Sequence, residues 1–161
     1  MDQNYFKSST GAELNLYSAV PVGSIRGVIQ ITHGMVEHAG RYNRFAEKCL
    51  ENGFAVFAHD LRGHGKTKAE DAPLGCFGTS NGLSLVLEDQ NCVIELAKQK
   101  FPGAPIICFG HSLGAIIALN YTFMHPTKVS GLACWNRPES KLLAKLSQGI
   151  LPVSYTHLRA H

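Results

Sequence analysis

One serine of the sequence stands where a serine can act as a nucleophile. Ser112 lies within Gly110-His-Ser-Leu-Gly114, which matches the pattern Gly-x-Ser-x-Gly. An apolar strand pattern at 106–109 precedes this motif, and an apolar helical pattern at 113–124 follows it. In such a strand–turn–helix the serine backbone is strained, and the residues two places away must lack side chains. We therefore predict a nucleophile elbow with Ser112 as the nucleophile and Gly110 and Gly114 as its glycines.

A serine nucleophile also needs backbone N–H groups that stabilise the negative oxygen of its intermediate. One such amide belongs to the residue after the nucleophile, which is Leu113. The second comes from the loop after an earlier strand, where His33-Gly34-Met35 follows an apolar segment. We predict that Met35 supplies this amide, that Gly34 lets the backbone pass close to the substrate, and that His33 holds the loop rather than acting as a base.

The segment Asp60-Leu-Arg-Gly-His-Gly65 follows another apolar strand pattern. We expect Asp60 and Arg62 to brace this loop by hydrogen bonds. A metal site formed by His59, Asp60 and His64 is disfavoured, because these residues lack a recognised ligand spacing. A phosphate-binding loop at 63–67 is also disfavoured, because the first glycine of the P-loop pattern is missing.

The chain alternates strand patterns with helix patterns, and short turns separate them. This alternation predicts an α/β fold with a doubly wound, mostly parallel sheet. A loop rich in Gly, Ser, Thr, Asp and Pro is expected at 66–82. The expected strands are 14–17 (at an edge), 27–32, 54–58, 106–109 and 129–135, and the expected helices are 41–52, 85–100, 113–124 and a start at 141–151.

Three motifs together resemble a known family. Residues 33–42 (His-Gly-Met-Val-Glu-His-Ala-Gly-Arg-Tyr), 60–65 and 110–114 occur in the order found in α/β-hydrolases called monoacylglycerol lipases, lysophospholipases or serine aminopeptidase-like hydrolases. The resemblance covers roughly residues 10–151 and implies the same roles for Ser112, Met35 and Leu113. It also implies that 141–151 begins a lid, inserted after the sixth strand, that admits acyl chains.

The chain departs from this family after the lid. In the α/β-hydrolase fold the triad order is Ser, then Asp or Glu, then His. Residues 153–161 (Val-Ser-Tyr-Thr-His-Leu-Arg-Ala-His) resemble one reading frame of a transposase adapter used for sequencing libraries. We therefore expect 1–151 to be the N-terminal part of a hydrolase domain, 152–161 to be adapter read-through, and the triad Asp and His to be absent. A native, short polar C-terminus is the alternative.

The composition of the chain indicates which classes of partner and which cellular location to expect. Apolar residues make up 45% of the 161 positions and charged residues 17%, which is typical of a globular protein. The net charge of +3 is small, and its Lys and Arg form no run, so nucleic acid is not expected. Five cysteines without a CxxC pair indicate free thiols rather than disulfides. With no signal-peptide pattern at Met1, a cytoplasmic location is expected, with peripheral membrane contact through the lid as the only membrane association.

The resemblance implies that the parent protein is a carboxylic-ester hydrolase that acts on monoacylglycerols or lysophospholipids. No metal ion or organic cofactor is required for that chemistry. Because a serine without a base is a weak nucleophile, we expect this chain by itself to be close to inactive. The alternatives are an aminopeptidase-like amide hydrolase, a fragment without function, and a binding module with a vestigial elbow. The sequence leaves the oligomeric state open.

Overall fold

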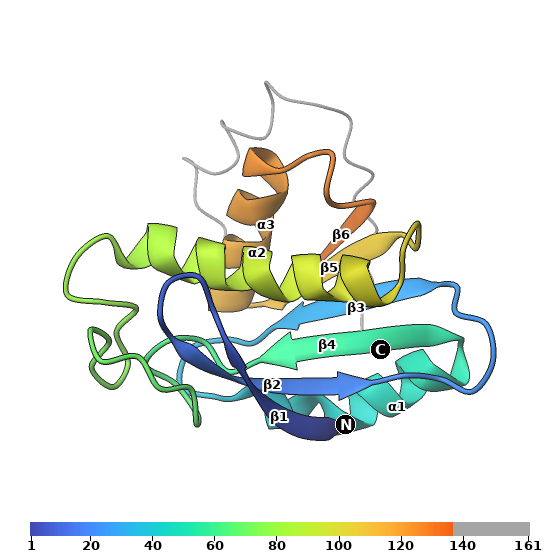
Figure 1. The fold of residues 1–161 in the computed structure, drawn as a ribbon, viewed down its shortest axis with the longest axis horizontal. Helices are drawn as coiled ribbons and strands as arrows, with labels where there is room; N and C mark the ends of the chain where they lie inside the picture. The colour runs from blue at the N-terminus through green and yellow to red at the C-terminus, as the bar shows by residue number, and fades with distance from the viewer. Residues whose placement is uncertain (137–161) are drawn as a thin grey trace.

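The computed structural model describes residues 1–136, and within them six strands form one sheet in the order β1-β2-β4-β3-β5-β6 (Figure 1). Strands β3, β4, β5 and β6 are parallel, whereas β2 pairs antiparallel with both β1 and β4. The sheet is therefore mostly parallel, as predicted. The strand bounds are β1 Asp2–Lys7, β2 Glu13–Ala19, β3 Gly27–Thr32, β4 Phe54–His59, β5 Ile106–His111 and β6 Gly131–Trp135.

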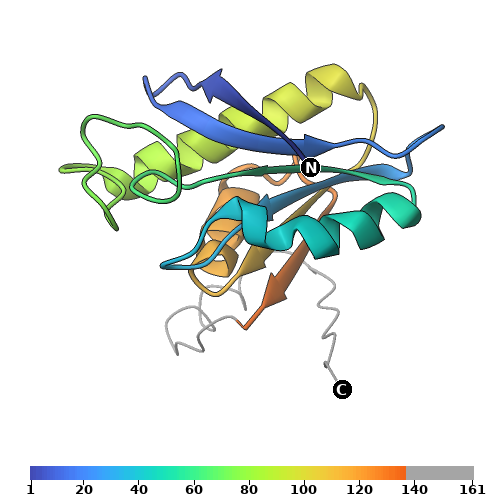
Figure 2. The ribbon, with the colours of Figure 1, turned by 90° about the horizontal axis from the view of Figure 1, so that it is seen from below.

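Helices cover both faces of this sheet (Figure 2). Helix α1, Asn43–Glu51, follows a short 3-10 turn at Ala39–Tyr42 and packs on one face against β4. Helices α2, Gly82–Lys100, and α3, Leu113–Met124, pack on the other face. Each face has its own apolar core, and the two cores are separated by the strands. This arrangement confirms the doubly wound α/β prediction.

The periodicity of the sequence accounts for these elements. Strand β4 is apolar on both faces because it is buried between α1 and the helices opposite. Helix α1 buries Ala46 and Cys49, which are spaced as one helical face. Helix α3 is apolar nearly all round, and half of its twelve residues are buried. Within residues 1–136, no helix is long and apolar enough to cross a membrane.

Three element predictions were wrong in detail. The strand at 14–17 is longer and does not lie at the edge, because β1 pairs with it on the outer side. Strand β1 was not predicted from the sequence. Most of its side chains are polar and exposed, so they show no alternation of apolar and polar residues. The helix expected at 41–52 is a 3-10 turn followed by α1, and α2 begins at Gly82 rather than at residue 85.

The parallel register brings three loops to one edge of the sheet. Ile31 pairs with Ala58, and Thr32 pairs with Gly110, so β3, β4 and β5 end at nearly the same level. The loops that begin at His33, Asp60 and Ser112 therefore meet there. The predicted lid start at 141–151 and the predicted adapter tail at 152–161 lie outside the described residues.

Candidate active site

Ser112 occupies a sharp turn between β5 and α3. Its backbone angles are φ 52° and ψ −115°, which lie in a region that side-chain-bearing residues rarely adopt. The Ser112 amide donates to the carbonyl of Trp135 at 2.9 Å, and its own carbonyl accepts the Ala115 amide at 3.0 Å. The serine therefore stands directly before the first turn of α3, where the helix dipole favours negative charge. This strained turn is the backbone geometry that the predicted nucleophile elbow requires, and the role of Ser112 as a nucleophile stays a prediction.

Glycine is required on both sides of this turn. A Cβ at Gly110 would lie 2.5 Å from the Cα of Ala115, and a Cβ at Gly114 would lie 2.5 Å from the carbonyl oxygen of His33. Real Cβ atoms do not approach backbone atoms so closely, so neither position accepts a side chain without movement of the backbone. The two glycines thus allow α3 to pack directly against the end of β3.

The loop after β3 lies against the elbow. A Cβ at Gly34 would lie 3.2 Å from the carbonyl oxygen of His111, so this loop and the residue before Ser112 are in close contact. Met35 follows Gly34 on the loop, and Leu113 is the first residue of α3. Within residues 1–136, neither the Met35 amide nor the Leu113 amide has a hydrogen-bond acceptor. Both amides thus remain available to a ligand oxygen.

Glu37 joins this loop to the elbow, a role that the sequence analysis missed. Its Oε1 accepts hydrogen bonds from the Gly34 amide (2.5 Å) and the Tyr42 hydroxyl (2.8 Å), and it lies 2.9 Å from Nδ1 of His111. Burial alone would raise the pKa of the Glu37 carboxyl, but these bonds from His111, Gly34 and Tyr42 together lower it. Glu37 is thus a carboxylate that fixes Gly34 beside the residue preceding Ser112.

His33 holds the loop after β3 by hydrogen bonds, as predicted from the sequence. The Leu61 amide donates to its Nε2 at 2.9 Å, so the ring proton must lie on Nδ1, which donates to the Gly34 carbonyl at 2.8 Å. Burial lowers the pKa of His33 to about 4. The ring is therefore neutral near pH 7 and holds two loops together, and both of its nitrogens are engaged.

Asp60 also holds neighbouring segments together by hydrogen bonds. Its carboxylate accepts hydrogen bonds from the Ala39 amide (2.8 Å), the Lys66 amide (2.8 Å) and the side chain of Asn15 (2.7 Å). These donors belong to three different segments, so one buried carboxylate ties them together. The prediction that Asp60 braces its loop is confirmed.

Arg62 braces the same loop from its other side. The guanidinium is buried and donates to the Phe77 carbonyl at 2.8 Å and to the Thr10 hydroxyl at 2.8 Å. It also forms ion pairs with Asp89 and Asp71. The long loop between β4 and α2 is thereby attached to α2 and to the turn between β1 and β2, as the predicted bracing role requires.

The residues considered as metal ligands do not converge. Asp60 is occupied by its three donors, and Nδ1 of His64 bonds the Arg62 carbonyl at 2.9 Å. His59 is fully buried, and burial lowers its pKa. In the described part of the chain, no group of three His, Cys, Asp or Glu side chains is placed to hold a metal ion.

No base is hydrogen-bonded to the Ser112 hydroxyl in the described part of the chain. This hydroxyl makes no hydrogen bond within residues 1–136. His125 is the only histidine after Ser112 in this range, and it lies at the far end of α3, where its ring stacks near Tyr121. A helix of this length separates the two by roughly 18 Å. His125 therefore cannot take the proton of Ser112.

Comparison with known proteins identifies the family. The model of the family described as serine aminopeptidase, S33, matches residues 23–149. The chain belongs to this family. The α/β-hydrolase resemblance drawn from the three motifs is thereby confirmed.

Relatives with a similar sequence or structure carry related names. A monoacylglycerol lipase of Mycolicibacterium smegmatis is 35% identical over 66% of the chain, and a monoglyceride lipase of Mus musculus is 30% identical over 82%. The crystal structure of a carboxyl esterase from Bacillus coagulans superposes with a TM-score of 0.75 at 32% identity, covering 83% of this chain and 43% of that one. The chain spans 36% and 45% of the length of the two lipases.

The close packing around Gly114 predicts that a methyl group at this position lowers the stability of the fold. Gly114→Ala should lower the free energy of unfolding by about 3 kcal/mol, because the new Cβ overlaps the carbonyl oxygens of Thr32 and His33. Gly131→Ala is the control, since its Cβ would make only ordinary contacts with Ile107. Urea unfolding followed by circular dichroism measures both. Equal stability of the two variants would contradict this account of the elbow.

The low pKa of His33 predicts a loss of stability in acid. Between pH 6.5 and 4 the unfolded chain binds a proton on this ring that the folded chain does not, so the free energy of unfolding falls as the pH falls. A shift from 6.5 to about 4 corresponds to about 3 kcal/mol over this window. His33→Gln should lose correspondingly less stability between these pH values. An identical pH slope in the variant would refute the assignment.

Removing the Glu37 carboxylate should loosen the loop. Glu37→Ala leaves the Gly34 amide and the Tyr42 hydroxyl without their acceptor, which should lower the free energy of unfolding by about 2 kcal/mol. Glu47→Ala, at an exposed position of α1, is the matched control and should change it by less than about 0.5 kcal/mol. Faster amide hydrogen exchange at Gly34 in the first variant only would locate the effect.

Proposed function

We propose that the protein hydrolyses carboxylic esters of the monoacylglycerol type through an acyl-enzyme formed on Ser112. The observation that carries this proposal is the strained backbone of Ser112 at the start of α3, with the loop of Gly34 and Met35 packed against it. The names of the lipase and esterase relatives support an ester as the substrate.

In this proposal the described residues stabilise charge. The Ser112 oxygen attacks the ester carbonyl carbon, and the carbonyl oxygen becomes an oxyanion that accepts hydrogen bonds from the Met35 and Leu113 amides. The dipole of α3 acts in the same direction. Collapse of the tetrahedral intermediate expels the alcohol and leaves an ester of Ser112, which water then hydrolyses. A base outside residues 1–136 must take the proton of Ser112 and pass it to the oxygen of the departing alcohol.

A second candidate is the hydrolysis of amide bonds, because the matching family model is named for an aminopeptidase. An amide has a poorer leaving group and needs stronger proton donation to its nitrogen. Lysophospholipids form a third substrate class with the same ester chemistry. Rates on acyl esters, lysophospholipids and prolyl aryl amides, measured side by side on a protein of the relatives' length, separate these candidates.

Substitution of the nucleophile tests the proposal. In a protein that carries this chain at the length of its relatives, Ser112→Ala should reduce the hydrolysis of a nitrophenyl ester by about 10⁴-fold or more. Ser130→Ala, at an exposed serine beyond α3, should leave the rate unchanged. The chain of 161 residues should hydrolyse the ester near the background rate. Activity that persists in Ser112→Ala would disprove the mechanism, and rapid hydrolysis by the 161-residue chain would disprove the need for a base beyond residue 161.

A further inference from the structure

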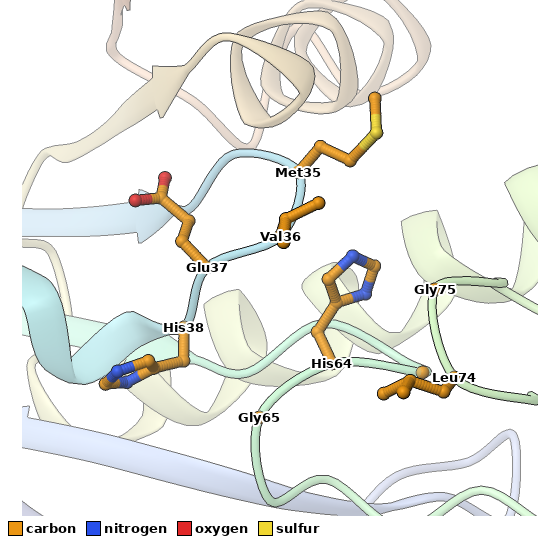
Figure 3. Close-up of a pocket in the computed structure, with 9 residues that line it drawn as sticks. Met35, Val36, Glu37, His38, His64, Gly65, Leu74 and Gly75 are labelled. Carbon is orange, nitrogen blue, oxygen red and sulfur yellow. The ribbon is translucent and has the colours of Figure 1, made fainter.

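The loop that carries Met35 has little support from the side. A pocket of about 380 Å³ separates it from the loop after β4, so that Met35 and Val36 lie opposite His64 and Leu74 (Figure 3). The side chains of Met35 and Val36 are 64% and 86% exposed. The direction of the Met35 amide is therefore set mainly from the base of the loop, where β3 ends at Thr32.

Three polar side chains are buried directly below this base. Gln30 and Thr32 project from β3 to the face of the sheet that α2 covers, and Gln90 projects from α2 toward them. All three are 0% exposed. The surrounding core is apolar and includes Val28 and Cys108. Buried amides and hydroxyls are costly without hydrogen bonds, so the bonds among these three side chains decide how this part of the core packs.

The Thr32 hydroxyl lies at the centre of these hydrogen bonds. It is 3.2 Å from Nε2 of Gln30, 3.3 Å from Oε1 of Gln30 and 3.2 Å from Oε1 of Gln90. Because it carries one proton, it donates to one amide oxygen at a time, and it accepts from Nε2 of Gln30 when it donates to Gln90. Nε2 of Gln30 also donates to the Ile31 carbonyl at 3.1 Å, and Nε2 of Gln90 reaches Sγ of Cys108 at 3.9 Å. The series thereby connects β3, α2 and β5.

Thr32 is also in contact with the helix that carries the other amide of the candidate site. A Cβ at Gly114 of α3 would overlap the Thr32 carbonyl oxygen, and α3 begins at Leu113. In the other direction the chain reaches Met35 three residues after Thr32. A rotation of the Thr32 backbone would therefore move the Met35 amide relative to the Leu113 amide. The hydrogen bond from the Thr32 side chain to Gln90 opposes this rotation.

Stability alone does not account for three polar side chains at this place. Removal of one partner from a buried hydrogen bond is costly, but replacement of all partners by apolar groups of the same shape is nearly neutral. A connected network of buried polar groups instead makes the arrangement of a core unique and rigid. The arrangement that this network fixes is the end of β3 against α2 and α3.

We propose that Gln90 is a positioning residue, which acts through the Thr32 hydroxyl to hold the Met35 amide at the distance from the Leu113 amide that an oxyanion requires. This inference rests on the proposed function, in which the two amides bind the oxyanion. Gln90 is buried in the core and does not touch the substrate. Loss of its bond to Thr32 leaves binding of the ester unchanged and weakens stabilisation of the transition state, so it lowers kcat without raising KM.

The first test removes the network from a protein of the relatives' length while keeping the shapes of its side chains. The triple variant carries Thr32→Val, Gln90→Met and Gln30→Met. Its urea midpoint should stay within about 0.5 M of the parent, whereas its kcat for a nitrophenyl ester should fall at least about tenfold with KM unchanged. Thr32→Ser keeps the hydroxyl and should keep most of kcat. Gln99→Met, at an exposed glutamine of α2, is the matched control and should change neither value.

The second test measures how well the two amides bind an oxyanion. The probe is phenylboronic acid, because the Ser112 oxygen adds to boron, the serine proton passes to the base of the proposed mechanism, and the resulting tetrahedral anion places an oxygen at the amides. Its inhibition constant should rise at least about tenfold in the triple variant and stay unchanged in Gln99→Met. A larger fraction of unfolded protein would lower the rate of hydrolysis without altering this constant.

The outcomes separate this inference from the proposed function. Ser112-dependent hydrolysis with an unchanged inhibition constant in the triple variant would overturn the role of Gln90 but leave the proposed function standing. With no Ser112-dependent hydrolysis of any ester the proposed function fails, and amide hydrogen exchange alone decides. Faster exchange at Met35 in the triple variant than in Gln99→Met would then support positioning of this loop by Gln90, and equal exchange would refute it.

Discussion

The candidate site depends on one close approach of two backbones. The first turn of α3 lies against the carbonyl ends of Thr32 and His33, and Gly114 makes this possible because it has no side chain. Protein interiors are packed as densely as organic crystals, so a gap or a methyl group at this contact would displace a whole strand or helix. The same contact sets the separation of the loop that carries Met35 from the helix that begins at Leu113. The geometry of the two free amides is therefore a property of the sheet and not of flexible loops.

Two carboxylates hold the loops around this contact in fixed positions. Loop backbone groups need partners, and Glu37 and Asp60 provide them from within the protein. Glu37 binds the Gly34 amide and approaches His111, whereas Asp60 binds amides at Ala39 and Lys66. Hydrogen bonds to charged groups contribute about 1.5–3 kcal/mol each, about twice the value for neutral pairs. Negative charge close to the elbow also disfavours a second anion there, which makes the neighbouring amide donors and the dipole of α3 more important.

The tight turn at Ser112 could be predicted from the sequence because its determinants are local. Ser112, its two glycines and the flanking strand and helix lie within about twenty residues, and their spacing is fixed by the geometry of a single turn. The role of Glu37 could not be read in this way, because its partner His111 lies 74 positions away and is brought close only by the parallel register. Strand β1 was missed because its order comes from pairing with β2 rather than from apolar burial.

Free amides and backbone strain make the candidate site unfavourable to folding, and this bears on how a substrate could be bound there. A strained residue such as Ser112 costs about 1–3 kcal/mol, and an amide without an acceptor costs a similar amount where water cannot reach it. In the proposed mechanism neither cost is recovered when the ester binds, because the two amides would bind fully only the oxyanion of the transition state. Binding of the ground state must then come from another part of the substrate.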